Sequence, residues 1–495
     1  MLKKYSIYFS LADKFFNKLF FIFITLFSLK ISDYFYSYLI LFFVLANYFY
    51  EIISLSIPKI FNTFYKISGP KKLSILAGTN LYISLSIFFI FFLLFIICKN
   101  FLISNFNIST INFYFAFIIL GFSIFLNELI NQYAFLKLNH VKIYIYDIFT
   151  MIVIFLISIL TIFSFDFTIK QKIFMIILYY SILQLSFRVV KLILFRSDIT
   201  FNVKKIYKEN NFNELFDITK YILPIFVISL LVLSQLNISR FVILYFENPS
   251  SFAIFVFHIQ IIELCSMFFM ATHQLSDPKI SLFTRNYQLT SFKILRNKLF
   301  NIFFTIVPLL LLFIYFIIYE ITQIIGVNIK INLILFIILS INFILIYFFF
   351  TIYQYIIMIN QRTFLIKATI LSLILNIIFS FIFTNFFSIT GLAFANLISN
   401  FFLFLKCNNF TNFFFIRKKN IKDLFFLIFR FSLMITFILI YDYLFAFENI
   451  LVNLSVKILY FLILFIISEL IISKKLKILY VLNNFTQIIN LSSKK

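Results

Sequence analysis

The sequence predicts an all-α integral membrane protein with about fourteen membrane-spanning helices. Of its 495 residues, 63% are hydrophobic and 12% are charged, whereas soluble domains carry about 25% charged residues. Apolar runs of about 20 residues recur along the chain, and the mean hydropathy is +1.07. Lysines and arginines gather in alternate connections between these runs. Together these observations exclude a water-soluble fold.

Each apolar run is long enough for one helix to cross the hydrocarbon core of a bilayer, at about 1.5 Å per residue. Helices are expected because isolated strands cannot satisfy their backbone in lipid, and barrel strands would alternate polar with apolar residues. The expected spans are 14–31, 34–57, 73–98, 111–132, 143–165, 173–195, 221–246, 252–275, 299–320, 331–358, 366–385, 388–406, 424–446 and 450–473.

Basic residues mark the cytoplasmic side of a membrane protein. Of the 42 Lys and Arg residues, most lie in every second connection, beginning with residues 1–18 and ending with 474–495. The intervening connections hold Lys30, Lys99, Lys170, Lys172 and Lys330. Both termini are therefore predicted to be cytoplasmic. Topology accounts for the net charge of +24, and no nucleic-acid partner is expected.

The longest polar stretch, 196–220, is predicted to be a cytoplasmic linker with an amphipathic surface helix. It separates an N-lobe of six helices, 1–195, from a C-lobe of six more, 221–406. Residues 407–495 then hold two further helices and a cytoplasmic tail. The three cysteines stand far apart, so neither a disulfide framework nor a metal site is expected. No cofactor is expected either.

Ionisable residues at membrane depth need a partner or a watery cavity, because burying an unpaired charge in lipid is costly. Two residues equally distant from a helical turn lie at equal depth, and this register pairs Arg430 with Glu469 and Asp442 with Lys457 around the turn near Asn449. We interpret both as structural ion pairs between the last two helices.

The same register pairs Asp147 with Arg188 across the loop at residues 165–170. This pair is either structural or part of a substrate cavity.

Arg240 stands level with His258 in its hairpin, and Glu263 lies deeper by about 7.5 Å. One interpretation is an Arg240–Glu263 ion pair. The other is a water-filled cavity in which Arg240 binds an anionic head group, because its planar fork suits phosphate. Glu263 would then balance the charge or take up a proton, and His258 would be a weaker candidate for a proton relay.

Three segments resemble one family of transporters. The stretch from Tyr221 to Ser281 contains Leu223-Pro224, Arg240 and Pro278 at places similar to those in the second lobe of Wzx-type lipid-linked oligosaccharide flippases. The sequence ITGLAFANLIS, with Gly391 and Ala395, resembles that family's helix 12, and residues 32–60 resemble its helix 2. The helix layout also resembles the wider multidrug, oligosaccharidyl-lipid and polysaccharide exporter superfamily.

The resemblance implies a flippase, not an enzyme. It would move a polyprenyl-pyrophosphate-linked oligosaccharide across the bacterial cytoplasmic membrane by alternating access, for assembly of a surface polysaccharide such as O-antigen. Its partners would be membrane lipids and possible polysaccharide polymerases and glycosyltransferases. No nucleotide-binding G-x-x-x-x-G-K-[ST] motif occurs, so coupling to H⁺ or Na⁺, or passive transport, is expected.

Two alternatives stay open at this point. One is an ion-coupled multidrug antiporter of the same superfamily, although buried acids would suit that role better than Arg240. The other is a membrane glycan polymerase or glycosyltransferase. Its acidic candidates in the short outer loops are Asp33, Asp166, Glu247, Glu320 and Glu448.

Overall fold

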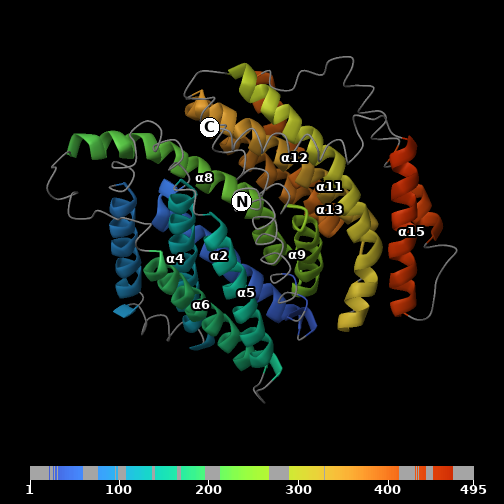
Figure 1. Ribbon diagram of the computed structural model, residues 1–495, viewed down its shortest axis with the longest axis horizontal. Helices are drawn as coiled ribbons and strands as arrows, with labels where there is room; N and C mark the ends of the chain where they lie inside the picture. Colours follow the sequence, from blue (N-terminus) through green and yellow to red (C-terminus); the bar gives the residue numbers. More distant parts are fainter. Residues whose placement is uncertain are drawn as a thin grey trace. The chain divides into compact units, whose positions relative to one another are not determined.

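The regular elements of the described chain are helices, as Figure 1 shows for the computed structural model of the protein. The fold-class prediction of an all-helical membrane protein is confirmed. The structure describes residues 22, 26, 28–30, 32–58, 76–94, 96–97, 108–136, 140–163, 169–195, 212–266, 289–327, 329, 331–359, 361–411, 430, 432, 434–441 and 450–471.

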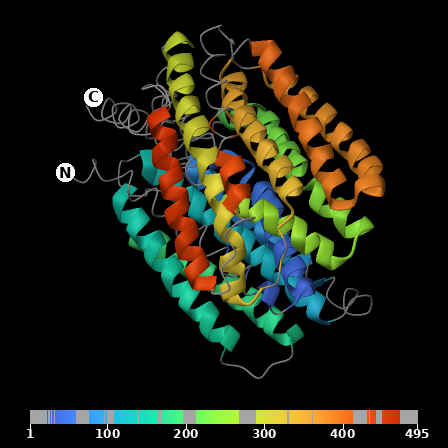
Figure 2. The same ribbon diagram turned by 90° about the vertical axis from the view of Figure 1, so that its right-hand side faces the viewer.

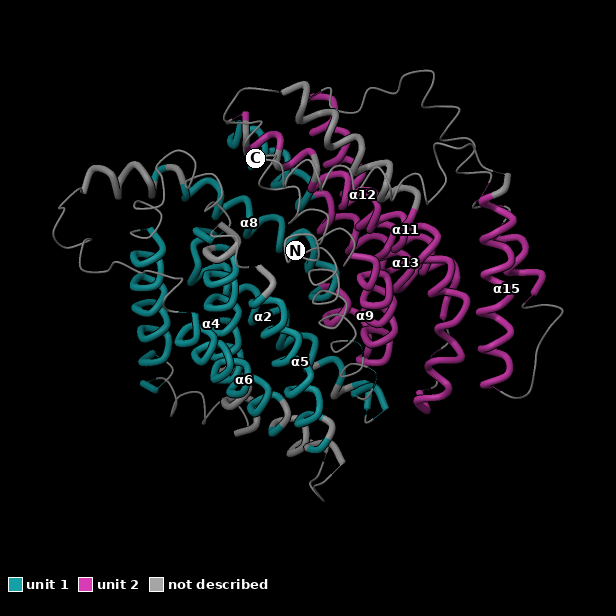
Figure 3. The backbone as a smooth tube through the Cα atoms, viewed as in Figure 1, with its two compact units in different colours: residues 1–241, 361–374 teal, residues 242–360, 375–495 magenta. Residues whose placement is uncertain are grey.

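The chain forms two compact units, coloured separately in Figure 3. The first unit takes Met1–Phe241 and Gln361–Ile374, and the second takes Val242–Asn360 and Leu375–Lys495. The division falls within a long helix near residue 241, whereas the predicted boundary between the lobes is the segment 196–220. The lobe boundaries stay predictions.

The first unit is built from packed apolar helices. Its helices are α2 (Asp33–Ser54), the span Leu76–Leu94, α4 (Ile108–Leu136), α5 (His140–Phe163), α6 (Ile169–Leu194) and most of α8 (Phe212–Phe246).

Helix α4 lies at the centre of these contacts, packed against both α2 and α6. At Gly121 a Cβ atom would lie 2.7 Å from Phe49 Cδ1 and 2.8 Å from the Ala46 carbonyl oxygen. A glycine is needed there because helices in lipid associate through close backbone approach.

The second unit contains α9 (Pro249–Glu263), α11 (Leu289–Ile325), α12 (Leu333–Met358), most of α13 (Arg362–Thr411) and α15 (Ile450–Ile471). Helix α15 runs beside α11, and α12 packs against α9 (Figure 2). An apolar cluster of buried Leu309, Phe316 and Met434 with Phe461 and Leu464 fills the space between α11 and the C-terminal helices.

Helix α13 is a folded hairpin of two helices. Its backbone leaves helical geometry at Ser388, with φ 52° and ψ −135°. The amide of Asn376 donates to Asn396 Oδ1 at 2.9 Å, although 20 residues of unbroken helix would separate them by about 30 Å. A Cβ atom at Gly391 would lie 2.0 Å from the Phe383 carbonyl oxygen. The two arms match the expected spans 366–385 and 388–406, and Gly391 permits their close approach.

Eight described helices are long and apolar enough to cross a membrane, and the α13 hairpin is counted among them as one. The total of fourteen spans and the cytoplasmic position of both termini stay predictions. Two helices extend beyond their apolar spans. Helix α8 begins at Phe212 and contains the span Ile222–Phe246, close to the expected 221–246, and α11 begins at Leu289 and contains the span Ile306–Ile325, which overlaps the expected 299–320. No glycine or proline interrupts either extension, so the polar ends continue as helix.

Candidate functional site

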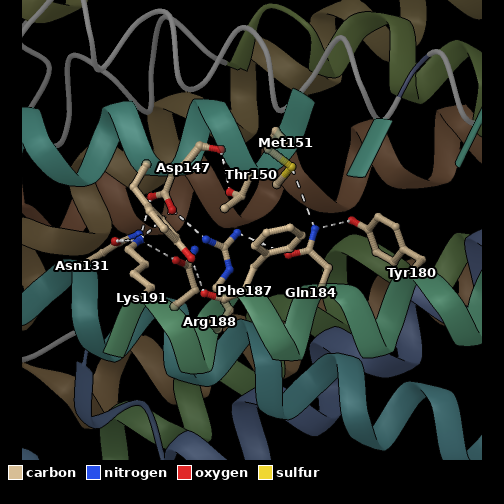
Figure 4. A network of polar contacts seen from close by, with 11 residues as sticks. Asn131, Asp147, Thr150, Met151, Tyr180, Gln184, Phe187, Arg188 and Lys191 are labelled. Carbon is tan, nitrogen blue, oxygen red and sulfur yellow. Dashed lines mark hydrogen bonds and ion pairs between the residues drawn. The ribbon is translucent and has the colours of Figure 1, made fainter. Parts of the chain in front are cut away.

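A buried network of charged side chains joins α5 to α6 in the first unit (Figure 4). Asp147 on α5 accepts hydrogen bonds from two cations of α6. Arg188 Nη1 lies 2.6 Å from Asp147 Oδ1, and Lys191 Nζ lies 2.7 Å from the same oxygen. Arg188 is 3% exposed and Asp147 is 4% exposed. Two cations therefore share one carboxylate oxygen.

Lys191 has additional partners on α4. Its Nζ donates to Asn127 Oδ1 at 2.9 Å and to Asn131 Oδ1 at 2.7 Å, and it also reaches Asp147 Oδ2 at 2.8 Å. The side chain is 0% exposed. An ammonium group has three N–H donors, so these oxygens satisfy Lys191 fully. The lysine holds three helices together.

The network continues along one face of α6. Arg188 Nη2 donates to Gln184 Oε1 at 3.3 Å, and Gln184 Nε2 lies 3.2 Å from the Tyr180 hydroxyl and 3.9 Å from Met151 Sδ. Positions 180, 184 and 188 are spaced by four, so their side chains stack on one helical face. This face presents a line of polar groups within the first unit.

The sequence register predicted that Asp147 and Arg188 would meet, and the ion pair is present. Lys191 lies inside the expected span 173–195 but was not named as a candidate in the sequence analysis. The signal that could have found it is its spacing of three from Arg188, which places both cations on one face of α6.

Arg240 lies on α8 beside a second group of polar residues. Its Nη1 donates to Asn237 Oδ1 at 3.0 Å, and the Tyr48 hydroxyl of α2 donates to Ser234 Oγ at 3.2 Å. The Arg240 side chain is half-buried. Arg240 belongs to the first unit and Glu263 to the second, so the Arg240–Glu263 ion pair stays a prediction. Glu263 is half-buried and ends α9.

His258 is fully buried on α9, and both its ring nitrogens are engaged. The backbone N–H of Asn332 donates to Nε2 at 3.1 Å, so Nε2 is an acceptor. The proton is then on Nδ1, which lies 2.7 Å from the Ile254 carbonyl oxygen. These bonds describe a neutral imidazole that anchors the start of α12 to α9. The geometry favours the structural interpretation of His258 over the proton relay.

The C-terminal ion pairs differ from the expectation in one respect. Arg430 Nη2 lies 2.8 Å from Glu469 Oε1, as the hairpin register predicts. Lys457 Nζ lies 3.0 Å from Glu320 Oε1 on α11, a partner that the hairpin register did not include. Asp442 lies outside the described residues, so the Asp442–Lys457 pair stays a prediction.

The position of Glu320 differs from the prediction, which placed this residue in a short outer loop. It lies within α11, is 2% exposed, and accepts a second hydrogen bond from Asn453 Nδ2 at 3.0 Å. Lys457 additionally donates to the Phe316 carbonyl oxygen at 3.2 Å and sits 4.7 Å from the centre of the Phe316 ring. This buried polar contact ties α15 to α11.

Charge reversal tests the Arg430–Glu469 pair. Either single change, Arg430→Glu or Glu469→Arg, places two like charges together in lipid, and we expect it to lower the amount of folded protein in membranes several-fold. The double reversal should recover most of that loss in fluorescence-detected size-exclusion chromatography. A double variant no better than the singles would show that the pair does not stabilise the fold.

Among the described residues, no group of three or more His, Cys, Asp or Glu side chains could hold a metal ion. The described sites hold guanidinium, ammonium and amide donors together with the carboxylates that pair with them. Such donors suit anionic and hydroxyl-rich ligands.

Comparisons with known proteins relate the chain to solved structures through its fold. No family model matches it, and no curated protein matches it. A mutant of the Vibrio cholerae MATE transporter VcmN has a TM-score of 0.58 at 12% identity, covering 82% of this chain and 96% of that chain. The lipid II flippase MurJ, in an inward closed conformation, has a TM-score of 0.54 at 16% identity, covering 94% and 97%.

A third similar structure is an outward-facing multidrug resistance MATE family transporter of the MOP superfamily. Its TM-score is 0.56 at 12% identity, and the match covers 88% of this chain and 97% of that one. The chain is thus a multi-pass membrane protein with the fold found in MATE transporters and in MurJ.

Proposed function

We propose that this protein is a transporter that flips an amphiphile with a large anionic head group across a membrane. The observation that carries the proposal is the buried guanidinium group of Arg188 on α6 and the half-buried one of Arg240 on α8, in a fold similar to a lipid II flippase. A buried arginine is costly in lipid, and its planar fork matches the oxygens of a phosphate. Anion recognition at membrane depth gives a physical reason for keeping it there.

The substrate class we propose is a polyprenyl-pyrophosphate-linked oligosaccharide, crossing the bacterial cytoplasmic membrane for surface polysaccharide assembly. The resemblance of the α8 segment to Wzx-type flippases supports this choice. In the proposed mechanism, Arg240 binds the pyrophosphate while the sugars cross through water and the polyprenyl tail stays in lipid. Arg188 and Asp147 belong to the same pathway, Glu263 balances charge there, and H⁺ or Na⁺ supplies the driving force.

An ion-coupled multidrug antiporter is the second candidate, and the MATE structures among the similar folds favour it. Glu51 on α2 is one buried carboxylate suited to a cation. It is 6% exposed and accepts a hydrogen bond from Ser56 Oγ at 3.0 Å. The described cations are nevertheless the better match to an anion. A membrane polymerase or glycosyltransferase is less well supported, since Glu320 proves to be buried within α11.

Substitution of Arg240 tests the proposed function in cells. Arg240→Ala removes both the charge and the fork, so export of the surface glycan should stop and lipid-linked precursor should accumulate on the inner leaflet. Arg240→Lys keeps the charge but loses the two-point contact, and partial export should remain. Glycan export is measured at matched protein levels, with precursor quantified by extraction.

The matched control is Lys142→Ala, which removes an exposed cation at the start of α5 and should leave export unchanged. Genes for glycosyltransferases and a polysaccharide polymerase next to this one would add independent support. Normal export by an abundant Arg240→Ala protein would contradict the proposed role of Arg240.

A further inference from the structure

The two cations around Asp147 hold it unequally. Lys191 Nζ contacts both carboxylate oxygens, at 2.7 and 2.8 Å, whereas Arg188 contacts Oδ1 alone through Nη1 at 2.6 Å. Lys191 by itself can therefore neutralise Asp147. The contact of Arg188 with Asp147 could break without leaving a carboxylate uncompensated in a dry interior.

Lys191 is fixed, whereas Arg188 has binding capacity to spare. The lysine is held by Asn127 and Asn131 on α4 as well as by Asp147. Arg188 has five N–H donors, and within the described part of the chain it uses one on Asp147 and one, at 3.3 Å, on Gln184. Its only contact with Asp147 among the described hydrogen bonds is this single one, and the side chain is 3% exposed.

We propose that Lys191 is the permanent counter-ion of Asp147, and that it frees Arg188 to exchange Asp147 for a phosphate oxygen of the transported substrate. This inference rests on the proposed function, and it assigns Lys191 the part of a positioning residue. Arg188 binds the anion directly. Asp147 holds Arg188 in place while no substrate is bound.

The surroundings of Arg188 suit such an exchange. Gln184 and Tyr180 follow it along the same face of α6 and carry amide and hydroxyl groups, which can bind phosphate or sugar oxygens. Figure 4 shows these side chains in one line from Lys191 past Arg188 toward Tyr180. An arginine that swings from a carboxylate to a phosphate keeps a charge-assisted hydrogen bond in both states.

The test measures binding of geranylgeranyl pyrophosphate to the purified full-length protein in detergent, by isothermal titration calorimetry. Arg188→Gln should weaken binding about 10- to 100-fold, the equivalent of one or two lost charge-assisted bonds. Its melting temperature should stay close to that of the wild type because Lys191 still neutralises Asp147. Arg188→Lys retains the charge without the planar guanidinium, so its affinity for geranylgeranyl pyrophosphate should lie between those of the wild type and Arg188→Gln.

The variant Lys191→Met tests whether Lys191 acts by freeing Arg188 or only by supporting helix packing. In this variant Arg188 becomes the cation that neutralises Asp147, so binding should weaken by a similar factor even though Arg188 is intact. Adding Asp147→Asn releases Arg188 again, and the double variant Asp147→Asn with Lys191→Met should regain binding within about threefold of the wild type. A residue that only supports packing would not show this recovery. Lys142→Met, at an exposed site, is the control.

The possible outcomes distinguish failure of this inference from failure of the proposed function. Unchanged binding in Arg188→Gln, or no recovery in the double variant, would overturn the inference while the proposed function stands. A wild-type protein that binds no geranylgeranyl pyrophosphate would contradict the proposed substrate class, and the inference would fall with it. Inorganic pyrophosphate is the second probe: the same pattern of variants with it would support the exchange and show that the prenyl tail is not needed for binding.

Discussion

Asp147→Asn should greatly reduce the amount of folded protein, because it removes the carboxylate from two buried cations at once. Arg188 and Lys191 are 3% and 0% exposed, and breaking a buried ion pair by removing one partner costs about 3–5 kcal/mol. Native proteins are stable by only about 5–15 kcal/mol, so such a loss is a large fraction of the total. Folded protein in membranes is measured with a fluorescent fusion and size-exclusion chromatography.

Two further variants serve as a control and as a rescue for the abundance of Asp147→Asn. Asp33→Asn removes an exposed carboxylate in the first turn of α2 and should leave abundance unchanged. Adding Lys191→Met to Asp147→Asn removes one of the two uncompensated cations, so much of the lost protein should return. Wild-type abundance of the single Asp147→Asn variant would show that the network does not hold α5 to α6.

Glu320→Gln should have the second large effect, on the attachment of α15 to α11. The amide can still accept the hydrogen bond from Asn453, but it leaves the charge of Lys457 buried against the Phe316 ring. We expect a loss of about 3–5 kcal/mol, measured as a lower melting temperature of the detergent-solubilised protein. Lys457→Met alone should be similarly harmful, because it leaves the carboxylate of Glu320 uncompensated.

The double variant Glu320→Gln with Lys457→Met should be more stable than either single variant, since a neutral amide and an apolar side chain then replace the ion pair. The control is Glu247→Gln, which changes a carboxylate that accepts from Ser388 at an exposed contact. Additive losses in the double variant would mean that Glu320 and Lys457 stabilise the unit independently of each other.

Local geometry explains which features the sequence could predict. Apolar run length predicted the helices, and hairpin register predicted the contacts of Asp147 with Arg188 and of Arg430 with Glu469. These predictions succeed because two helices joined by a short turn have their depths fixed by counting residues from that turn. The turn of the α13 hairpin at Ser388 was likewise found from the break between apolar runs.

Contacts between helices distant in sequence could not be predicted in this way. Glu320 and Lys457 come from α11 and α15, and no turn relates their positions. The hydrogen bond from the Asn332 backbone N–H to His258 involves a main-chain group. Every residue type except proline carries that group, so the sequence does not indicate which one will bind. Lys191 was missed because the hairpin register paired only Asp147 with Arg188, and the other partners of Lys191, Asn127 and Asn131, lie on α4.

Transbilayer movement in proteoliposomes tests whether the protein flips the proposed lipid-linked substrate. The purified protein is reconstituted with a fluorescent polyprenyl-pyrophosphate-linked oligosaccharide, and a membrane-impermeant quencher reports the fraction exposed on the outer leaflet over time. Wild-type protein should make the inner-leaflet pool accessible, whereas Arg240→Ala liposomes should behave like protein-free ones. Equal rates for wild-type and protein-free liposomes, in the presence and absence of H⁺ and Na⁺ gradients, would contradict the proposed function.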